Sequence, residues 1–105
     1  MMTLTMTNHV TNDRIDRMMA IAEHIGWGVE LISVLDANNP SHILTLTSTG
    51  VLLIKSHTGH LITAYVPSAG KVRVMYSWLG LDHVPQAVYV RLQKSIKIMK
   101  KVGFY

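Results

Sequence analysis

The chain has 105 residues, a length that fits one compact domain. Hydrophobic residues make up 49% of it and charged residues 15%, which excludes intrinsic disorder as its main state. Cysteine is absent, so a disulfide scaffold, a Cys-based zinc site, an iron–sulfur cluster and a thiol nucleophile are excluded. No apolar run reaches the ~18–20 residues that span a bilayer, and the first ten residues do not have the pattern of a signal peptide. We therefore expect a cytoplasmic protein without membrane contact.

Charge is distributed unevenly along the chain. Residues 1–40 hold two Lys or Arg residues against five Asp or Glu residues, a net charge of −3. Residues 41–105 hold eight against one, a net charge of +7. A region this basic attracts polyanions, and nucleic acid is the commonest of these in the cytosol. The sequence therefore predicts RNA or another nucleic acid as partner, against the alternative of a small basic protein that binds nothing specific.

The first 40 residues predict a flexible segment and two helices. Residues 1–11 are rich in Thr and Met with weak alternation, and they predict a flexible N-terminal segment before a single domain at 12–105. Apolar residues then recur at helical spacing over 12–25, and Gly26 is suited to end that helix. Residues 29–37 predict a second short helix, which the following Asn-Asn-Pro would end.

The middle of the chain predicts a sheet. Ile, Leu, Val, Thr and Tyr alternate there with polar residues, and the Gly-containing segments TSTG, HTG and PSAG interrupt them. This pattern predicts four antiparallel strands, at residues 42–47, 51–56, 60–66 and 71–76. Residues 84–102 predict a long basic C-terminal helix. The fold class is therefore α+β: two N-terminal helices, a four-stranded antiparallel meander and the closing helix.

Turn chemistry predicts how these strands pair. TSTG and HTG each end in Gly, which supplies the left-handed residue of a three-residue hairpin loop. A two-residue loop would force a β-branched Thr to positive φ. The resulting register places Leu46 opposite Leu52 and Ile54 opposite Ile62. One face of the sheet is then almost purely aliphatic and is expected to be the core face.

Polar side chains collect on the opposite face of the predicted sheet. Lys and Arg donate charge-assisted hydrogen bonds to phosphate, and Thr and Tyr add neutral ones. We therefore predict a phosphate-binding surface, against the alternative that these residue types merely suit an exposed sheet. The PSAG turn leaves the register of the fourth strand, and so the face of its cations, open by one residue. The members of this surface are Thr45, Lys55, Thr63, Tyr65, Lys71 and Arg73.

Two further groups of side chains are candidates. His57 and His60 bracket a predicted turn, but zinc needs three or four ligands, and His42 would lie about 9–10 Å from His60. We therefore predict no metal site and no cofactor, and His57 remains a candidate proton donor or acceptor near neutral pH. Lys94 and Lys97 of the last helix are candidates for contact with a nucleic-acid backbone, against the alternative of a solvated helix face.

The order of elements and the segment KSHTGHLITAY at residues 55–65 resemble the small metal-independent ribonuclease superfamily, which includes barnase, the RelE-type toxins and the tRNA-cleaving colicin domains. In that superfamily RNA lies on a curved antiparallel sheet, and here Thr63 and Tyr65 stand where one strand supplies polar contacts. The resemblance covers about residues 12–76. The long basic C-terminal helix and the lack of a carboxylate on the predicted site face depart from it. The resemblance implies a toxin-type endoribonuclease of a phage or plasmid, with an acidic antitoxin or immunity protein as partner.

The mechanism under this hypothesis needs no metal. The 2′-OH of RNA attacks the adjacent phosphate and leaves a 2′,3′-cyclic phosphate. Lys55 or His57 takes the proton. Arg73 and Lys71 stabilise the charged phosphorane, while Tyr65 orients the phosphate or protonates the leaving oxygen.

Two alternatives to an enzyme remain open. A non-catalytic nucleic-acid-binding domain, or a phage or plasmid accessory protein, explains the charge without any tuned pKa. A homodimer that buries Val51, Leu53 and Leu61 between two sheets explains the apolar residues of the predicted open face.

Overall fold

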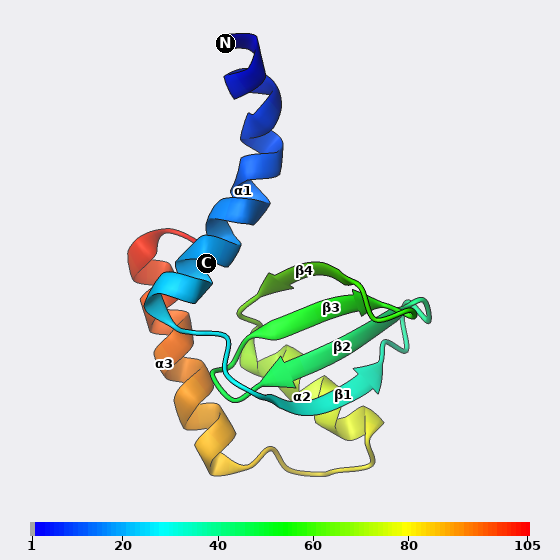
Figure 1. Ribbon diagram of the computed structural model, residues 1–105. Helices are drawn as coiled ribbons and strands as arrows, with labels where there is room; N and C mark the ends of the chain where they lie inside the picture. The colour runs from blue at the N-terminus through cyan, green and yellow to red at the C-terminus, as the bar shows by residue number, and fades with distance from the viewer. Residues whose placement is uncertain (1) are drawn as a thin grey trace.

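The computed structural model describes the backbone of residues 2–105 and the side chains of residues 13–105, so the predicted flexible segment at 1–11 lies outside the residues whose side chains are described. Four strands form one antiparallel sheet in the order β1-β2-β3-β4, and three helices surround it (Figure 1). The α+β class and the antiparallel sheet are therefore confirmed. In chain order the elements are α1 (Met2–His24), β1 (Glu30–Leu35), β2 (His42–Thr47), β3 (Leu52–Ser56), β4 (Leu61–Tyr65), α2 (Ala69–Trp78) and α3 (Gln86–Val102).

One helix, and not two, precedes the sheet, so the predicted second N-terminal helix at 29–37 is wrong. The segment forms β1, in which Ile32 pairs with Leu46 and Val34 pairs with Leu44. The side chains of Ile32 and Val34 pack against the core. A helix of nine residues is marginal without strong packing, whereas the strand gains its hydrogen bonds from β2.

The predicted strand at 71–76 is also wrong, because these residues lie within α2. Ser68 caps this helix, and its Oγ accepts a hydrogen bond of 3.2 Å from the backbone N of Lys71. The buried side chains of α2 are Val72, Met75 and Tyr76, which follow the helical spacing i, i+3, i+4. The alternation in KVRVMY also fits a strand, but a strand would turn Met75 away from the core.

The first hairpin has the predicted register. Leu44 pairs with Ile54 and Leu46 pairs with Leu52. Gly50 closes the turn in the left-handed conformation with φ +80°, as the turn chemistry requires.

The second hairpin is shifted by one residue relative to the prediction. Ile54 pairs with Thr63 and not with Ile62, and Leu52 pairs with Tyr65. The cause is a β-bulge at Ile54/Lys55, which adds one residue to β4. Because side chains alternate between the two faces of a strand, the shift turns Tyr65 to the face that carries Leu52.

The core lies between the sheet and the C-terminal helices. In Figure 1, α2 lies behind the sheet and α3 crosses the end where β2 turns into β3. Ser95 joins α3 to this turn, because its Oγ donates a 2.6 Å hydrogen bond to the carbonyl of Thr49. α3 ends at Gly103, which has φ +90° as predicted for a C-terminal glycine. The largest fully buried apolar side chains are Ile21, Leu44, Leu46, Leu52, Met75, Leu92 and Met99.

Candidate functional site

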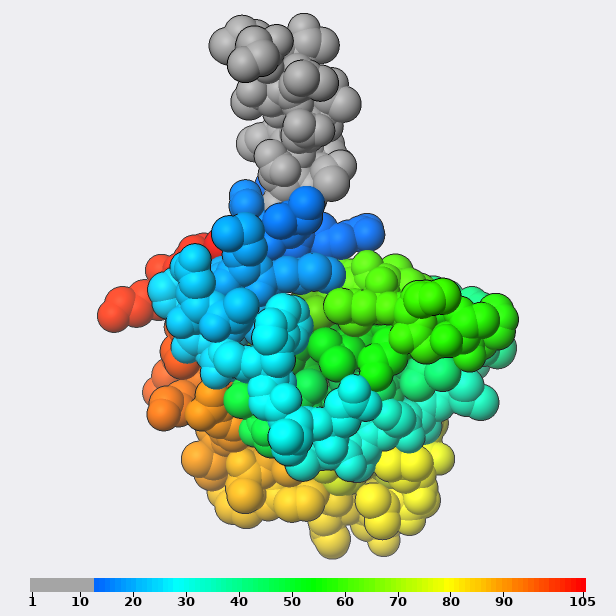
Figure 2. Space-filling model, in the orientation of Figure 1, coloured from blue at the N-terminus to red at the C-terminus, as the bar shows by residue number. Residues whose placement is uncertain are grey.

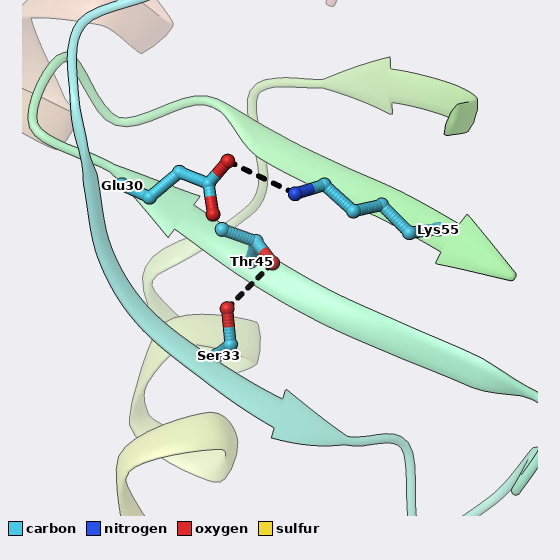
Figure 3. Close-up of polar contacts among 4 residues, drawn as sticks. All are labelled: Glu30, Ser33, Thr45 and Lys55. Atoms are coloured by element: carbon cyan, nitrogen blue, oxygen red, sulfur yellow. Dashed lines mark hydrogen bonds and ion pairs between the residues drawn. The ribbon is translucent and has the colours of Figure 1, made fainter. Parts of the chain in front are cut away.

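The face of the sheet turned away from α2 is open, and Figure 2 shows no helix over its centre. Two polar contacts lie on it (Figure 3). The Nζ of Lys55 donates to Oε2 of Glu30 over 2.9 Å, and the hydroxyls of Ser33 and Thr45 are hydrogen-bonded at 2.7 Å. The Lys55 side chain is only 21% exposed, against 55% for Glu30. The open face therefore holds a neutral ion pair and not a free cation.

Glu30 is the site residue that sequence reasoning missed. Residues 29–37 were predicted to be helical, which left the open face of the sheet without a carboxylate. Once β1 is a strand, Glu30 faces the same side as Lys55 and reaches it across β2 (Figure 3). Thr45, predicted to contact substrate, is fully buried on this face and bonds Ser33. The sequence ELISVL, at residues 30–35, is compatible with a strand, and this pattern is the signal that could have placed Glu30 on the sheet.

Tyr65 and Lys55 do not share a face, so the predicted grouping of these two residues is wrong. Tyr65 is half-buried and packs against the core. Burial raises the pKa of its phenol above the ordinary value of 10.0, Asp36 raises it further and Arg17 opposes the rise. Thr63 is held by Arg17 of α1, whose Nη2 donates to its Oγ1 over 2.8 Å. Both β4 residues therefore have structural partners within the chain.

The predicted cations of the fourth strand lie elsewhere, because that segment is α2. Lys71 places its Nζ 5.6 Å from the centroid of the Trp78 ring, within the range of a cation–π contact. Arg73 is exposed on the same helix, which lies behind the sheet. His57 is exposed in the β3–β4 turn. The predicted catalytic set of Lys55, His57, Tyr65 and Arg73 is therefore dispersed over the open face, a turn, the covered face and α2.

A second candidate surface lies on α3. From residue 69 to the C-terminus the chain holds seven Lys or Arg residues and one carboxylate side chain, Asp82. We name four exposed lysines on α3 the α3 basic stripe, and none of them forms an ion pair within the part of the chain that the structure describes. They are Lys94, Lys97, Lys100 and Lys101.

The α3 basic stripe adjoins a shallow hollow of about 400 Å³. Lys94 and Lys97 line it together with Tyr89 and Val90, so cations, an aromatic ring and an aliphatic side chain lie next to one another. This combination suits a ligand that carries both phosphates and planar rings. The two lysines are thus exposed on one helix face, as the sequence predicted.

No group of three or more His, Asp or Glu side chains among the described residues is arranged to hold a metal ion. None of the helices in the same part of the chain is long and apolar enough to cross a bilayer. Comparison with protein-family models, with curated proteins and with solved structures gives no match to this chain. The fold and its surfaces define an α+β protein with an ion-paired open sheet face and a basic helix whose lysines have no carboxylate partner among the described residues.

Proposed function

We propose that the protein is a non-catalytic nucleic-acid-binding domain that holds the phosphate backbone on the α3 basic stripe. One observation carries the proposal: the four lysines lie exposed along one helix with no acidic partner among the described residues. Lysines in this state bind phosphates and release the counterions condensed on the nucleic acid. Lys55 contributes little, because Glu30 already neutralises it.

The dimensions of the stripe fit a nucleic-acid strand. Lys94 and Lys101 are seven residues apart, which at about 1.5 Å per residue places them about 10 Å apart along the helix. Four successive phosphates of one strand, which are three steps of about 3.4 Å along a duplex axis, cover a similar length. The hollow beside Tyr89 offers a ring and an aliphatic side chain to a sugar or base.

Fluorescence anisotropy with labelled RNA and DNA at increasing salt tests this proposal. We expect affinity to fall steeply with salt, and the double variant Lys94→Gln/Lys97→Gln to weaken binding about tenfold or more. The slope of log affinity against log salt should become shallower by about 1.4–1.8, the value for two lost phosphate contacts.

The matched control is Lys71→Gln/Arg73→Gln on α2, which removes the same charge from another helix. Equal effects of the two double variants would show that net charge alone drives binding and would contradict an α3 site. No binding at low salt would contradict the whole proposal.

We infer a second candidate function, metal-independent RNA cleavage, from the contact between Glu30 and Lys55. The carboxylate of Glu30 would take the 2′-OH proton while O2′ bonds to phosphorus. The bond to O5′ breaks, and Lys55, which lies beside Glu30, returns a proton to that oxygen. Glu30 thus supplies the carboxylate general base that was missing from the mechanism predicted from the sequence.

Incubation of the protein with total RNA in EDTA distinguishes the two functions. Fragments with 2′,3′-cyclic phosphate ends, absent with Glu30→Gln and present with the exposed control Glu23→Gln, would support cleavage. A gel shift of intact RNA supports the non-catalytic function.

A further inference from the structure

The two edges of the sheet differ in how their backbone groups are satisfied. At β4, Nε of Arg17 donates to the carbonyl of Ala64 over 2.9 Å, and Nη1 of Arg14 lies 3.5 Å from the carbonyl of Ile62. These carbonyls are two residues apart, so they point to the same, outer side of the strand. Figure 1 shows α1 running past this edge. The β4 edge is therefore occupied by the chain itself.

The β1 edge has no such hydrogen-bonded cover among the described residues, and Leu31 at its start lines a hollow together with Ala87 and Val88 of α3. Beyond the pairing with β2, none of the hydrogen bonds among the described residues uses the backbone of residues 31–35. The bulge at Glu30/Ile32 leaves Ile32–Leu35 in regular extended conformation. Natural edge strands are usually blunted by Lys, Pro, a β-bulge or a covering element, and the bulge of β1 lies at its first residues, before the regular part. Residues 31–35 contain neither Lys nor Pro, and the one charged side chain of β1, Glu30, is turned to Lys55.

Exposed apolar side chains lie on β1 next to these free backbone groups. Leu31 is 45% exposed and Leu35 is 61% exposed. Leu35 ends the regular part of β1, and Leu31 is the residue at the bulge. The edge therefore offers both hydrogen-bonding groups and apolar area to another strand.

We propose that β1 pairs antiparallel with β1 of a second copy of this chain, which gives a dimer with a continuous eight-stranded sheet. Antiparallel pairing of identical strands has two-fold symmetry and uses the same surface of both copies, so it closes at two. The arginines on β4 prevent growth from the other edge. A register centred on Ser33 brings Leu31 of each copy opposite Leu35 of the other, where such pairs stabilise a sheet.

Sedimentation equilibrium of the full chain from micromolar to millimolar concentration tests the dimer. We expect a mass that rises from 11.7 kDa to twice that value. Leu35→Lys should weaken dimerisation at least tenfold, because it replaces both Leu31–Leu35 contacts of the seam with a lysine against a leucine, while far-UV circular dichroism stays unchanged. Hydrogen exchange at the β1 amides should slow as protein concentration rises.

The matched control is Leu61→Lys, which adds the same charge on β4 at a side chain that is 49% exposed. It should leave the dimer intact. Loss of the dimer in Leu61→Lys but not in Leu35→Lys would place the contact on the sheet face and overturn the proposal. A wild-type chain that stays monomeric at millimolar concentration would overturn it as well.

Discussion

Two glycines show how a single residue sets a turn. Gly50 and Gly59 both have positive φ, +80° and +91°, in the β2–β3 and β3–β4 turns. Their surroundings differ. A Cβ on Gly50 would lie 3.2 Å from the backbone Cα of Leu92, whereas a Cβ on Gly59 would meet nothing within 4 Å. The first glycine is therefore needed for its conformation and for the close approach of α3, and the second for its conformation alone.

We expect Gly50→Ala to destabilise the protein more than Gly59→Ala. The left-handed conformation costs an alanine about 1–2 kcal/mol at either position. At Gly50 the contact with backbone, which cannot rotate away, adds about 1–3 kcal/mol. Urea denaturation followed by circular dichroism measures both losses. Equal losses would contradict a tight contact between this turn and α3.

The raised pKa values of two tyrosines lead to a prediction of how stability depends on pH. Burial raises the pKa of Tyr65 and of Tyr76 above the ordinary value of 10.0. The folded protein therefore keeps protons that the unfolded chain releases near pH 10, so stability is fully present below that pH and falls as pH rises through the folded pKa values. The double variant Tyr65→Phe/Tyr76→Phe should lose less stability than the wild type between pH 9 and 11. Parallel curves of urea midpoint against pH would contradict this.

At the scale of elements, the fold could be predicted where a local signal decides it. Gly50 and the alternation around it determine the first hairpin and its register. Pro85 and Gly103 mark the ends of α3, at φ −53° and +90°. The segments that were misassigned, 29–37 and 71–76, have apolar residues that fit both the helical and the strand period. Only packing decides between them: β2 is available to pair with one, and the core takes Val72, Met75 and Tyr76 of the other.

The candidate site was less predictable than the fold, because its geometry depends on one inserted residue. The bulge at Ile54/Lys55 separates Lys55 from Tyr65, and no residue type in HTGHLITAY signals it. The misassigned segment 29–37 hid Glu30. Lys94 and Lys97 were placed correctly on an exposed helix face, since α3 has a clear period and needs no partner strand.

The attachment of α1 to β4 leads to a prediction at the same scale. Arg17 is half-buried and donates to Thr63 and Ala64 at 2.8 and 2.9 Å. Arg14 is exposed and makes one long contact of 3.5 Å. Arg17→Met should cost about 2–3 kcal/mol, because it leaves the carbonyl and the hydroxyl without their charged donor. Arg14→Met should cost less than about 0.5 kcal/mol. Chemical denaturation compares them, and a similar loss in both would contradict Arg17 as the main clamp.

At the scale of the whole molecule, charge and packing are divided between two parts of the chain. The sheet neutralises its lysine, Lys55, with Glu30, while the C-terminal helices keep their cations free of carboxylate partners among the described residues. α2 and α3 therefore serve two purposes: one side of each closes the core, and the other remains basic. The proposed nucleic-acid contact lies on this outer side, and the proposed dimer contact lies on β1.

The neighbours within the sheet are also neighbours along the chain, with connecting segments of only a few residues. Such hairpins close within microseconds, whereas the bond from Arg91 to the carbonyl of Ile25 spans 66 residues, so we expect it to form later. During synthesis the sheet leaves the ribosome before α2 and α3, so Leu44, Leu46 and Leu52 stay uncovered until the last third of the chain emerges. A nascent chain that has emerged only as far as residue 68 would therefore be an aggregation-prone intermediate. This is the stage at which chaperones would be needed most.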